Sequence, residues 1–130
     1  MALVAFVDET TSGERSDAWH LEIFEERLTL RELIRRRVFQ EVAEHNANSA
    51  LTFRGLVQPS DTERVRDGFR MSGPRRVDPE AQFERAVEAF TRNGFVVLVN
   101  DEQIEDLETT LELRARTEIT FLKLVPLVGG

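Results

Sequence analysis

The chain has 130 residues, of which 41% are hydrophobic and 32% charged, with a formal net charge of −7 and no cysteine. This size and composition are typical of one globular domain with its own core. The lack of cysteine excludes disulfides, a thiol nucleophile and thiolate metal sites, and the acidic balance argues against nucleic-acid binding. No apolar run approaches the roughly 20 residues of a membrane span. The N-terminus has no signal-peptide pattern, so we expect a cytoplasmic protein that binds no membrane.

The N-terminal residues predict a β-hairpin. Residues 3–7 are a short apolar run rich in β-formers, and residues 10–14 have the composition of a turn. Residues 19–24 then alternate, which places Trp19, Leu21 and Ile23 on one face of a second strand.

The next segment predicts a long amphipathic helix. Thr29 and Glu32 have the spacing of a capping box, in which each side chain satisfies a backbone N–H of the first turn. Helical spacing puts one apolar stripe toward a core: Leu30, Leu33, Ile34, Val38 and Val42. The expected solvent side holds Arg31, Arg35, Arg36, Glu41 and Glu44.

Residues 49–93 are predicted to form an insertion with partial order. Residues 51–53 and 55–57 suit short extended pieces, and the arginine-rich stretch 64–76 is interpreted as a solvated loop, with a partner contact as the alternative. Asp78 and Pro79 suit the cap and first position of a second helix, predicted over 78–93. Its apolar stripe is Phe83, Ala86, Val87 and Phe90, and Asn93-Gly94 closes it.

The C-terminal third predicts strands. Residues 95–99 are wholly apolar, 100–101 form a turn, 103–107 a short edge segment, and Leu111 and Leu113 a connecting turn. In a last strand over 118–122, alternation points Ile119 and Phe121 inward and Thr120, Leu122 and Leu124 outward. Lys123 would then point inward, so either it extends to the sheet edge or the strand ends near Leu122. The order of elements predicts an α+β fold with one mixed sheet and helices on one face.

No pattern of catalytic or metal-ligating residues is evident. His20 and His45 are expected to be surface or boundary residues, and the acidic pairs at 25–26, 101–102 and 105–106 to be solvated turns. We therefore predict no catalytic residue, no metal and no cofactor of the chain's own, and a protein that is not an enzyme.

The sequence closes on Gly129-Gly130 after an apolar run over 121–128. Two glycines form a thin, conformationally free tip, so we expect residues 125–130 to be a flexible tail. A terminal carboxylate is a poor electrophile and becomes reactive only when another enzyme activates it. Lys123 is the only lysine, so it and the N-terminal amine are the possible acceptors of an isopeptide-type bond within the chain.

This order of elements, together with the tail, resembles the β-grasp, ubiquitin-like fold. Residues 95–107 are similar to the third-to-fourth strand unit of ubiquitin and of the sulfur carriers of molybdopterin and thiamine synthesis, and residues 118–130 to their last strand and tail. Residues 28–34 fit the entry to the β-grasp helix. The chain differs from ubiquitin and from a minimal sulfur carrier in the insertion at 49–93, which neither of them has. The resemblance implies a single ubiquitin-like domain over 1–130, with a central helix and an insertion that carries the second helix.

The resemblance also implies a function. An adenylating enzyme of the ubiquitin-activating type would use ATP to activate the carboxylate at Gly129-Gly130, for conjugation to amines of target proteins. The expected partners are that enzyme, a conjugating enzyme, a deconjugating protease and the targets; in some bacteria similar proteins work within anti-phage defence operons. The expected docking surface beside the tail consists of Leu122, Leu124, Pro126, Leu127 and Val128. The alternative for Leu122 and Leu124 is packing under the insertion.

Two other functions stay open on the sequence. One is a sulfur carrier that bears a C-terminal thiocarboxylate, against which the extra 45 or so residues of the insertion count. The other is a non-covalent interaction module in which the two glycines have no role.

Overall fold

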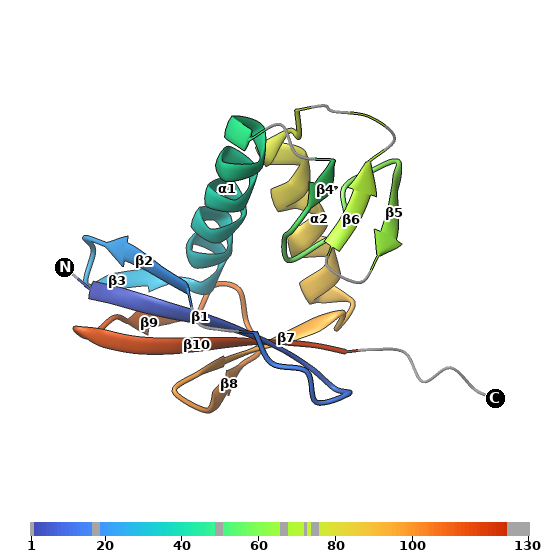
Figure 1. The fold of residues 1–130 in the computed structure, drawn as a ribbon. Helices are drawn as coiled ribbons and strands as arrows, with labels where there is room; N and C mark the ends of the chain where they lie inside the picture. Colours follow the sequence, from blue (N-terminus) through green and yellow to red (C-terminus); the bar gives the residue numbers. More distant parts are fainter. Residues whose placement is uncertain are drawn as a thin grey trace. The chain divides into compact units, whose positions relative to one another are not determined.

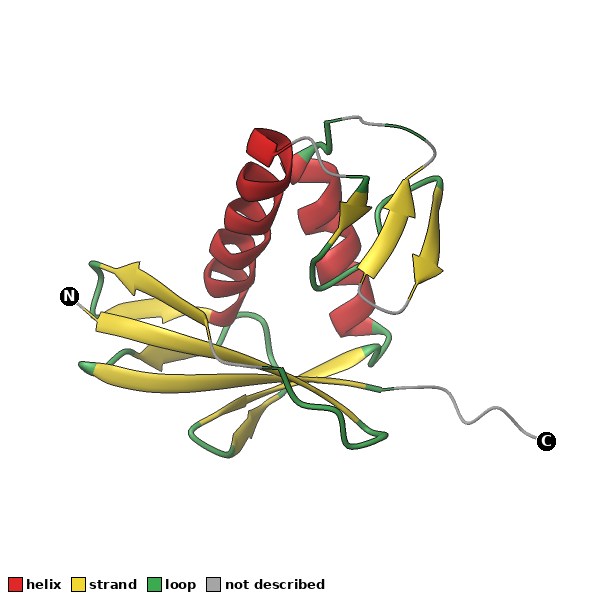
Figure 2. Ribbon diagram, viewed as in Figure 1, coloured by secondary structure: helices red, strands yellow, loops and turns green. Residues whose placement is uncertain are grey.

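The computed structural model describes residues 2–16, 19–48, 51–65, 68–71, 73 and 76–124. The fold is α+β, with two helices and three β-sheets in the described part of the chain (Figures 1 and 2). The chain divides into two compact units. Unit 1 combines Met1–Glu32 with Phe90–Gly130, and unit 2 is Leu33–Ala89.

Unit 1 contains a five-stranded mixed sheet in the order β2-β1-β10-β7-β8. Its strands are β1 (Ala2–Thr10), β2 (Trp19–Ile23), β7 (Phe95–Val99), β8 (Glu102–Ile104) and β10 (Arg116–Lys123). The two central strands, β1 and β10, run parallel, and every other neighbouring pair in this sheet is antiparallel. A separate two-stranded sheet pairs β3 (Arg27–Thr29) with β9 (Thr110–Glu112). The first and last strands of the chain are therefore neighbours at the centre of the main sheet.

Aromatic side chains form a continuous row within unit 1. From β2 to the end of α2 (Pro79–Thr91), neighbouring ring centroids are 4.8, 5.8, 5.9 and 5.8 Å apart, in the order Trp19, Phe6, Phe121, Phe95 and Phe90. Large buried rings dominate the energetics of a small core. The row therefore ties together the four strands that have the longest pairings.

Both helices begin at the caps that the sequence predicts. Thr29 Oγ1 accepts the N–H of Glu32 at 3.2 Å, at the start of α1 (Leu30–Asn48). Asp78 Oδ1 accepts the N–H of Glu80 at 3.1 Å, at the start of α2. The predicted apolar stripe of α1 is buried throughout. After α2, Asn93 donates its N–H to the carbonyl of Phe90 at 3.0 Å with a positive φ of 61°, as expected for a residue that closes a helix.

Unit 2 contains a three-stranded antiparallel sheet in the order β4-β6-β5. The strands are β4 (Thr52–Phe53), β5 (Thr62–Val65) and β6 (Gly68–Met71). Gly68 has a φ of +150°, and a Cβ there would lie 2.4 Å from the carbonyl oxygen of Phe53, so only glycine fits the close approach of β4 and β6. Elsewhere in unit 2, the Asn46 side chain binds the backbone of Val77 twice, at 2.8 and 3.1 Å.

Four expectations need correction. Three sheets replace the single mixed sheet. The stretch 64–76 is not simply a solvated loop, because it contains the end of β5 and all of β6. Leu111 lies in β9 rather than in a turn. Glu41 is not on the solvent side: its side chain is 11% exposed and pairs with the buried Arg37, whose guanidinium Nη2 lies 3.3 Å from Oε2 of Glu41.

In the part of the chain that the structure describes, neither helix has the length and apolar character needed to cross a membrane.

Candidate functional site

The site that the sequence predicts lies at the end of β10. This strand pairs with β1 over eight residues, from Leu3 opposite Arg116 to Thr10 opposite Lys123, and with β7 over five. Because it is hydrogen-bonded on both sides, β10 is an interior strand. A segment that follows it starts from a fixed point.

Backbone hydrogen bonds hold the chain as far as Leu124. The Lys123 carbonyl accepts the N–H of Thr11 at 3.1 Å, and Leu124 donates its N–H to the carbonyl of Gly94 at 3.1 Å. The strand therefore continues through Lys123, one residue beyond Leu122, so the expectation of a strand end near Leu122 holds to within one residue. Gly129, Gly130 and the docking residues Pro126, Leu127 and Val128 lie outside the described residues.

Lys123 is partly shielded by an ion pair. Its Nζ lies 4.0 Å from Oδ2 of Asp8, and the two side chains are 30% and 22% exposed. Asp8 lies in β1, opposite Phe121, so the register of the parallel pair brings this carboxylate to the same face as Lys123. This ion pair has to break before the amine of Lys123 can attack an electrophile. Lys123 is thus a poorer acceptor than a fully exposed lysine.

Two of the predicted docking residues, Leu122 and Leu124, lie within the described part, at alternate positions at the end of β10 and just after it. Leu122 is half-buried and lies opposite Val96 of β7, and Leu124 is 39% exposed just beyond the strand. The outer face of the sheet therefore keeps apolar surface at the point where the chain leaves β10. Its role in docking stays a prediction.

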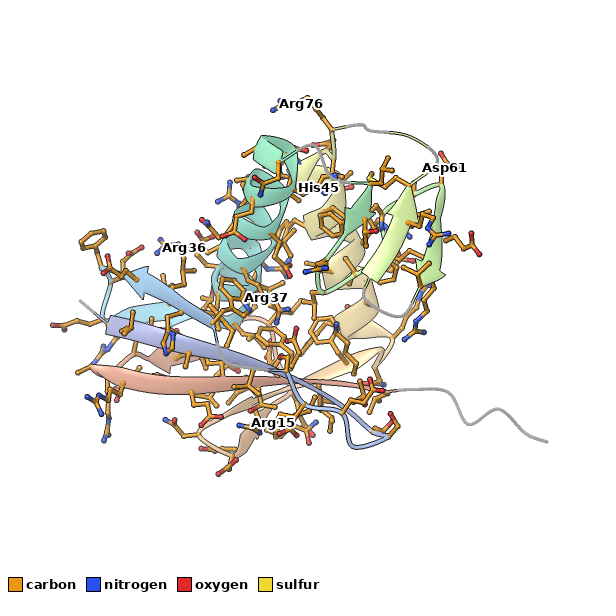
Figure 3. All side chains as sticks on the ribbon, viewed as in Figure 1. Arg15, Arg36, Arg37, His45, Asp61 and Arg76 are labelled. Carbon is orange, nitrogen blue, oxygen red and sulfur yellow. The ribbon has the colours of Figure 1, made fainter. Side chains whose placement is uncertain are left out.

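Arg15 covers the neighbouring part of that outer face. Its guanidinium binds Glu9 and, at 2.9 Å, Oε1 of Glu118 (Figure 3). Both hydrogen bonds raise the pKa of Arg15 above its ordinary value, and the bond to Glu9 has the larger effect. The two carboxylates flank the Val7–Thr120 pair in the register, so the guanidinium lies over that pair. This explains why Thr120 is only 7% exposed although it points outward as predicted.

Sequence reasoning missed Arg15 and Asp8 as members of this region. Arg15 binds Glu9 only six residues away, but its contact with Glu118 and that of Asp8 with Lys123 form through the parallel pairing of β1 with β10, across more than 100 residues of chain. A test for parallel register between the first and last apolar runs would have brought Asp8 close to Lys123.

Histidines and carboxylates form no metal site in the described residues, where no group of three or more potential ligands occurs. His20 is exposed as expected. His45 is only 7% exposed and packs against Phe53 edge-on, with 5.2 Å between the ring centroids, so the expectation of a surface or boundary position is wrong (Figure 3).

No model of a known protein family matches the chain, and no curated protein or solved structure matches it either.

Replacing Asp8 by asparagine is expected to raise the acylation rate of Lys123 by about two- to threefold, because a partly exposed ion pair worth roughly 0.5 kcal/mol no longer has to break before the amine attacks. Treatment with an acetylating ester, followed by peptide mass spectrometry, gives the rate, with the N-terminal amine as the internal reference. Glu22→Gln makes the same charge change at an exposed position of β2 and is expected to leave the rate unchanged. Equal rates in all three proteins would show that Asp8 does not shield Lys123.

Proposed function

We propose that this protein is a ubiquitin-like modifier of the β-grasp fold, conjugated to amines of target proteins through its C-terminal Gly129-Gly130. The observation that carries the proposal is the strand order of unit 1, β2-β1-β10-β7-β8, with β1 and β10 parallel at its centre. A β-grasp sheet has this arrangement: the first hairpin on one side, the last strand parallel to the first, and a second hairpin beyond it. The alternation of apolar residues alone does not specify that order.

Two features depart from the minimal fold. Beyond the central helix α1, unit 2 adds three short strands and most of α2, and unit 1 adds the β3–β9 pair. Neither interrupts the pairing of β10 with β1 and β7. The segment that precedes the tail therefore keeps the central position that the proposal requires.

The chemistry would take place on the tail, with the catalytic groups supplied by partner enzymes. A carboxylate oxygen of Gly130 attacks the α-phosphorus of ATP, and pyrophosphate leaves. A cysteine thiolate of the partner then attacks the acyl carbon, which forms a thioester and releases AMP. A lysine amine of the target displaces the thiolate, loses a proton and forms the isopeptide bond. This chain contributes the two glycines, which fit a narrow channel, and the interior strand that presents them.

Deletion of Gly130 is expected to abolish adduct formation, because the activating enzyme then meets a carboxylate one residue short of its catalytic site. The N-terminally tagged chain is expressed in cells that contain the cognate enzymes. Adducts appear as heavier bands, and digested targets carry a glycine remnant on lysine. Gly73→Ala is the matched control, since a Cβ at Gly73 meets no atom within 4 Å.

Adducts that persist after the deletion would contradict the proposal. An intact mass that rises by the exchange of one oxygen for sulfur, with no adducts, would instead indicate a sulfur carrier. Partner binding that is unchanged without Gly129 and Gly130, again with no adducts, would indicate a non-covalent interaction module.

A further inference from the structure

A groove of about 480 Å³ opens between the end of α2 and the β7–β8 hairpin, with all of its lining residues in unit 1. One wall is apolar and consists of Phe90, Phe95, Ile104 and Leu107. The rings of Phe90 and Phe95 meet nearly edge to face, at 60° with 5.8 Å between centroids. A groove of this volume accommodates one or two side chains of a bound peptide.

Acidic side chains also line the groove. Glu105, Asp106 and Glu108 line it, with Arg31 as the single cationic side chain. They belong to a segment, residues 101–113, that contains six carboxylates and no lysine or arginine, in a chain whose net charge is −7. Three of these six carboxylates line the groove, so part of the excess negative charge of the protein lies beside it.

The partners of these carboxylates differ. Oε1 of Glu108 binds Nε of Arg31 at 2.7 Å, and Oδ1 of Asp106 accepts the N–H of Glu108 at 2.8 Å. Glu105 is exposed and makes no ion pair with any residue that the structure describes. One cation is thus set against three carboxylates, and the pair that it forms leaves Glu105 available to an incoming positive charge.

We propose that this groove binds a basic, extended segment of a partner protein, with one lysine or arginine side chain inside it. The alkyl stem of such a side chain packs on an apolar wall while its charged head remains among polar groups, here Glu105 and Asp106. A cation beside aromatic rings gains a further attraction. An acidic segment would be repelled, and a wholly apolar one would leave the carboxylates facing uncharged surface.

The groove lies next to the point where the chain leaves the sheet. Leu124 donates its N–H to the carbonyl of Gly94 at 3.1 Å, and the neighbours of Gly94, Asn93 and Phe95, both line the groove. A partner held there is close to the start of residues 125–130. The identity of this partner as an enzyme that acts on the Gly130 carboxylate rests on the proposed function; the basic character of its segment does not.

The test uses an acetylated five-residue peptide of alternating lysine and leucine, titrated into the full, ¹⁵N-labelled chain. Amide resonances of the groove residues are expected to shift together, and a peptide with glutamate in place of lysine is expected to give no shifts. Glu105→Lys should weaken binding by about tenfold, since it replaces an attraction by a repulsion. Glu84→Lys is the matched control, because it makes the same charge change at an exposed position of α2 and is expected to leave the affinity unchanged.

Three results would overturn the proposal: shifts spread over the whole acidic surface, equal binding of the glutamate peptide, or equal weakening by both variants. The last would mean that only net charge matters. Glu105 forms no ion pair with any residue that the structure describes, so its replacement breaks none there, and circular dichroism checks the fold of each variant. Deletion of Gly130 leaves peptide binding unchanged if the groove acts as proposed. A protein that forms no adducts but binds the peptide at the groove therefore refutes the modifier and retains the basic-segment site.

Discussion

Replacing Glu41 by alanine is expected to lower the free energy of unfolding by about 3 kcal/mol, because it leaves a buried guanidinium without its carboxylate. Arg37 is 1% exposed, and its Nη2 lies 3.3 Å from Oε2 of Glu41 one turn further along α1 (Figure 3). The other carboxylate oxygen, Oε1, accepts the backbone N–H of Leu56 at 3.3 Å. The substitution therefore breaks an ion pair and also leaves a partly buried N–H without its acceptor.

Urea denaturation followed by circular dichroism measures the change. Glu44→Ala is the matched control on the same helix, because Glu44 is exposed and accepts only a side-chain hydrogen bond from Gln40, at 3.1 Å. Its expected effect is below about 0.5 kcal/mol. The double variant Arg37→Met with Glu41→Leu should regain most of the lost stability, since apolar residues of similar volume replace both charges. Equal effects of Glu41→Ala and Glu44→Ala would show that the Arg37 pair does not stabilise unit 2.

The contrast between Arg37 and its neighbours shows what the helical pattern determined and what it did not. Apolar spacing identified α1 and its buried stripe because that signal is contained within a few turns of helix. The same spacing placed Glu41 toward solvent, since an isolated helix has only one apolar face. The sequence around Glu41 does not reveal that residues 51–57 lie against it, so its burial depends on contacts made by a distant segment.

The sheets also show that local sequence patterns do not reveal contacts between distant segments. Four strands of the main sheet were predicted from alternation or from continuous apolar runs, whereas β8 (Glu102–Ile104) was predicted only as a short edge segment over 103–107. The two-residue turn at Asn100-Asp101 is the tight hairpin connection expected, with φ of 47° and 70°. Strands β3, β4 and β9 have only two or three residues each, too few for any period to be recognised. Leu111 pairs with Leu28 across more than 80 residues, and no local pattern indicates such a pairing.

In the candidate sites, too, local features could be predicted from the sequence and long-range contacts could not. The outward position of Leu122 in the last strand follows from alternation, which is a local property, whereas Leu124 lies just beyond the strand. The ion pair with Asp8 depends on the parallel register and could not be predicted without it. The carboxylates at 105–106 were interpreted as a solvated turn. Their exposure agrees with that, but the groove that they line also includes Phe90 of α2 and Phe95 of β7, which the turn itself does not specify.

Replacing Phe121 by alanine is expected to lower the free energy of unfolding by about 4 kcal/mol, the largest effect of any single change considered for unit 1. Phe121 is fully buried at the middle of the aromatic row, with ring centroids 5.8 Å from Phe6 and 5.9 Å from Phe95. Its removal leaves a cavity that touches β1, β10 and β7 at once, and rings held between three hydrogen-bonded strands have little freedom to close it. Leu124→Ala, just beyond the strand, is the control and should change stability by less than about 0.5 kcal/mol.

Hydrogen exchange extends this prediction from stability to function. The N–H of Thr11 binds the carbonyl of Lys123 at the end of β10, and the N–H of Leu124 binds the carbonyl of Gly94, just before β7. The exchange rates of these two amides therefore report how firmly the strand end is held. If the aromatic row fixes the strand that leads to the tail, Phe121→Ala should speed the exchange of both amides, whereas Glu41→Ala in unit 2 should speed neither under conditions where the protein stays folded. Faster exchange at Thr11 and Leu124 in Glu41→Ala alone would mean that the end of β10 depends on unit 2 rather than on the aromatic row. That result would remove the physical basis for treating β10 as an independent support of the tail.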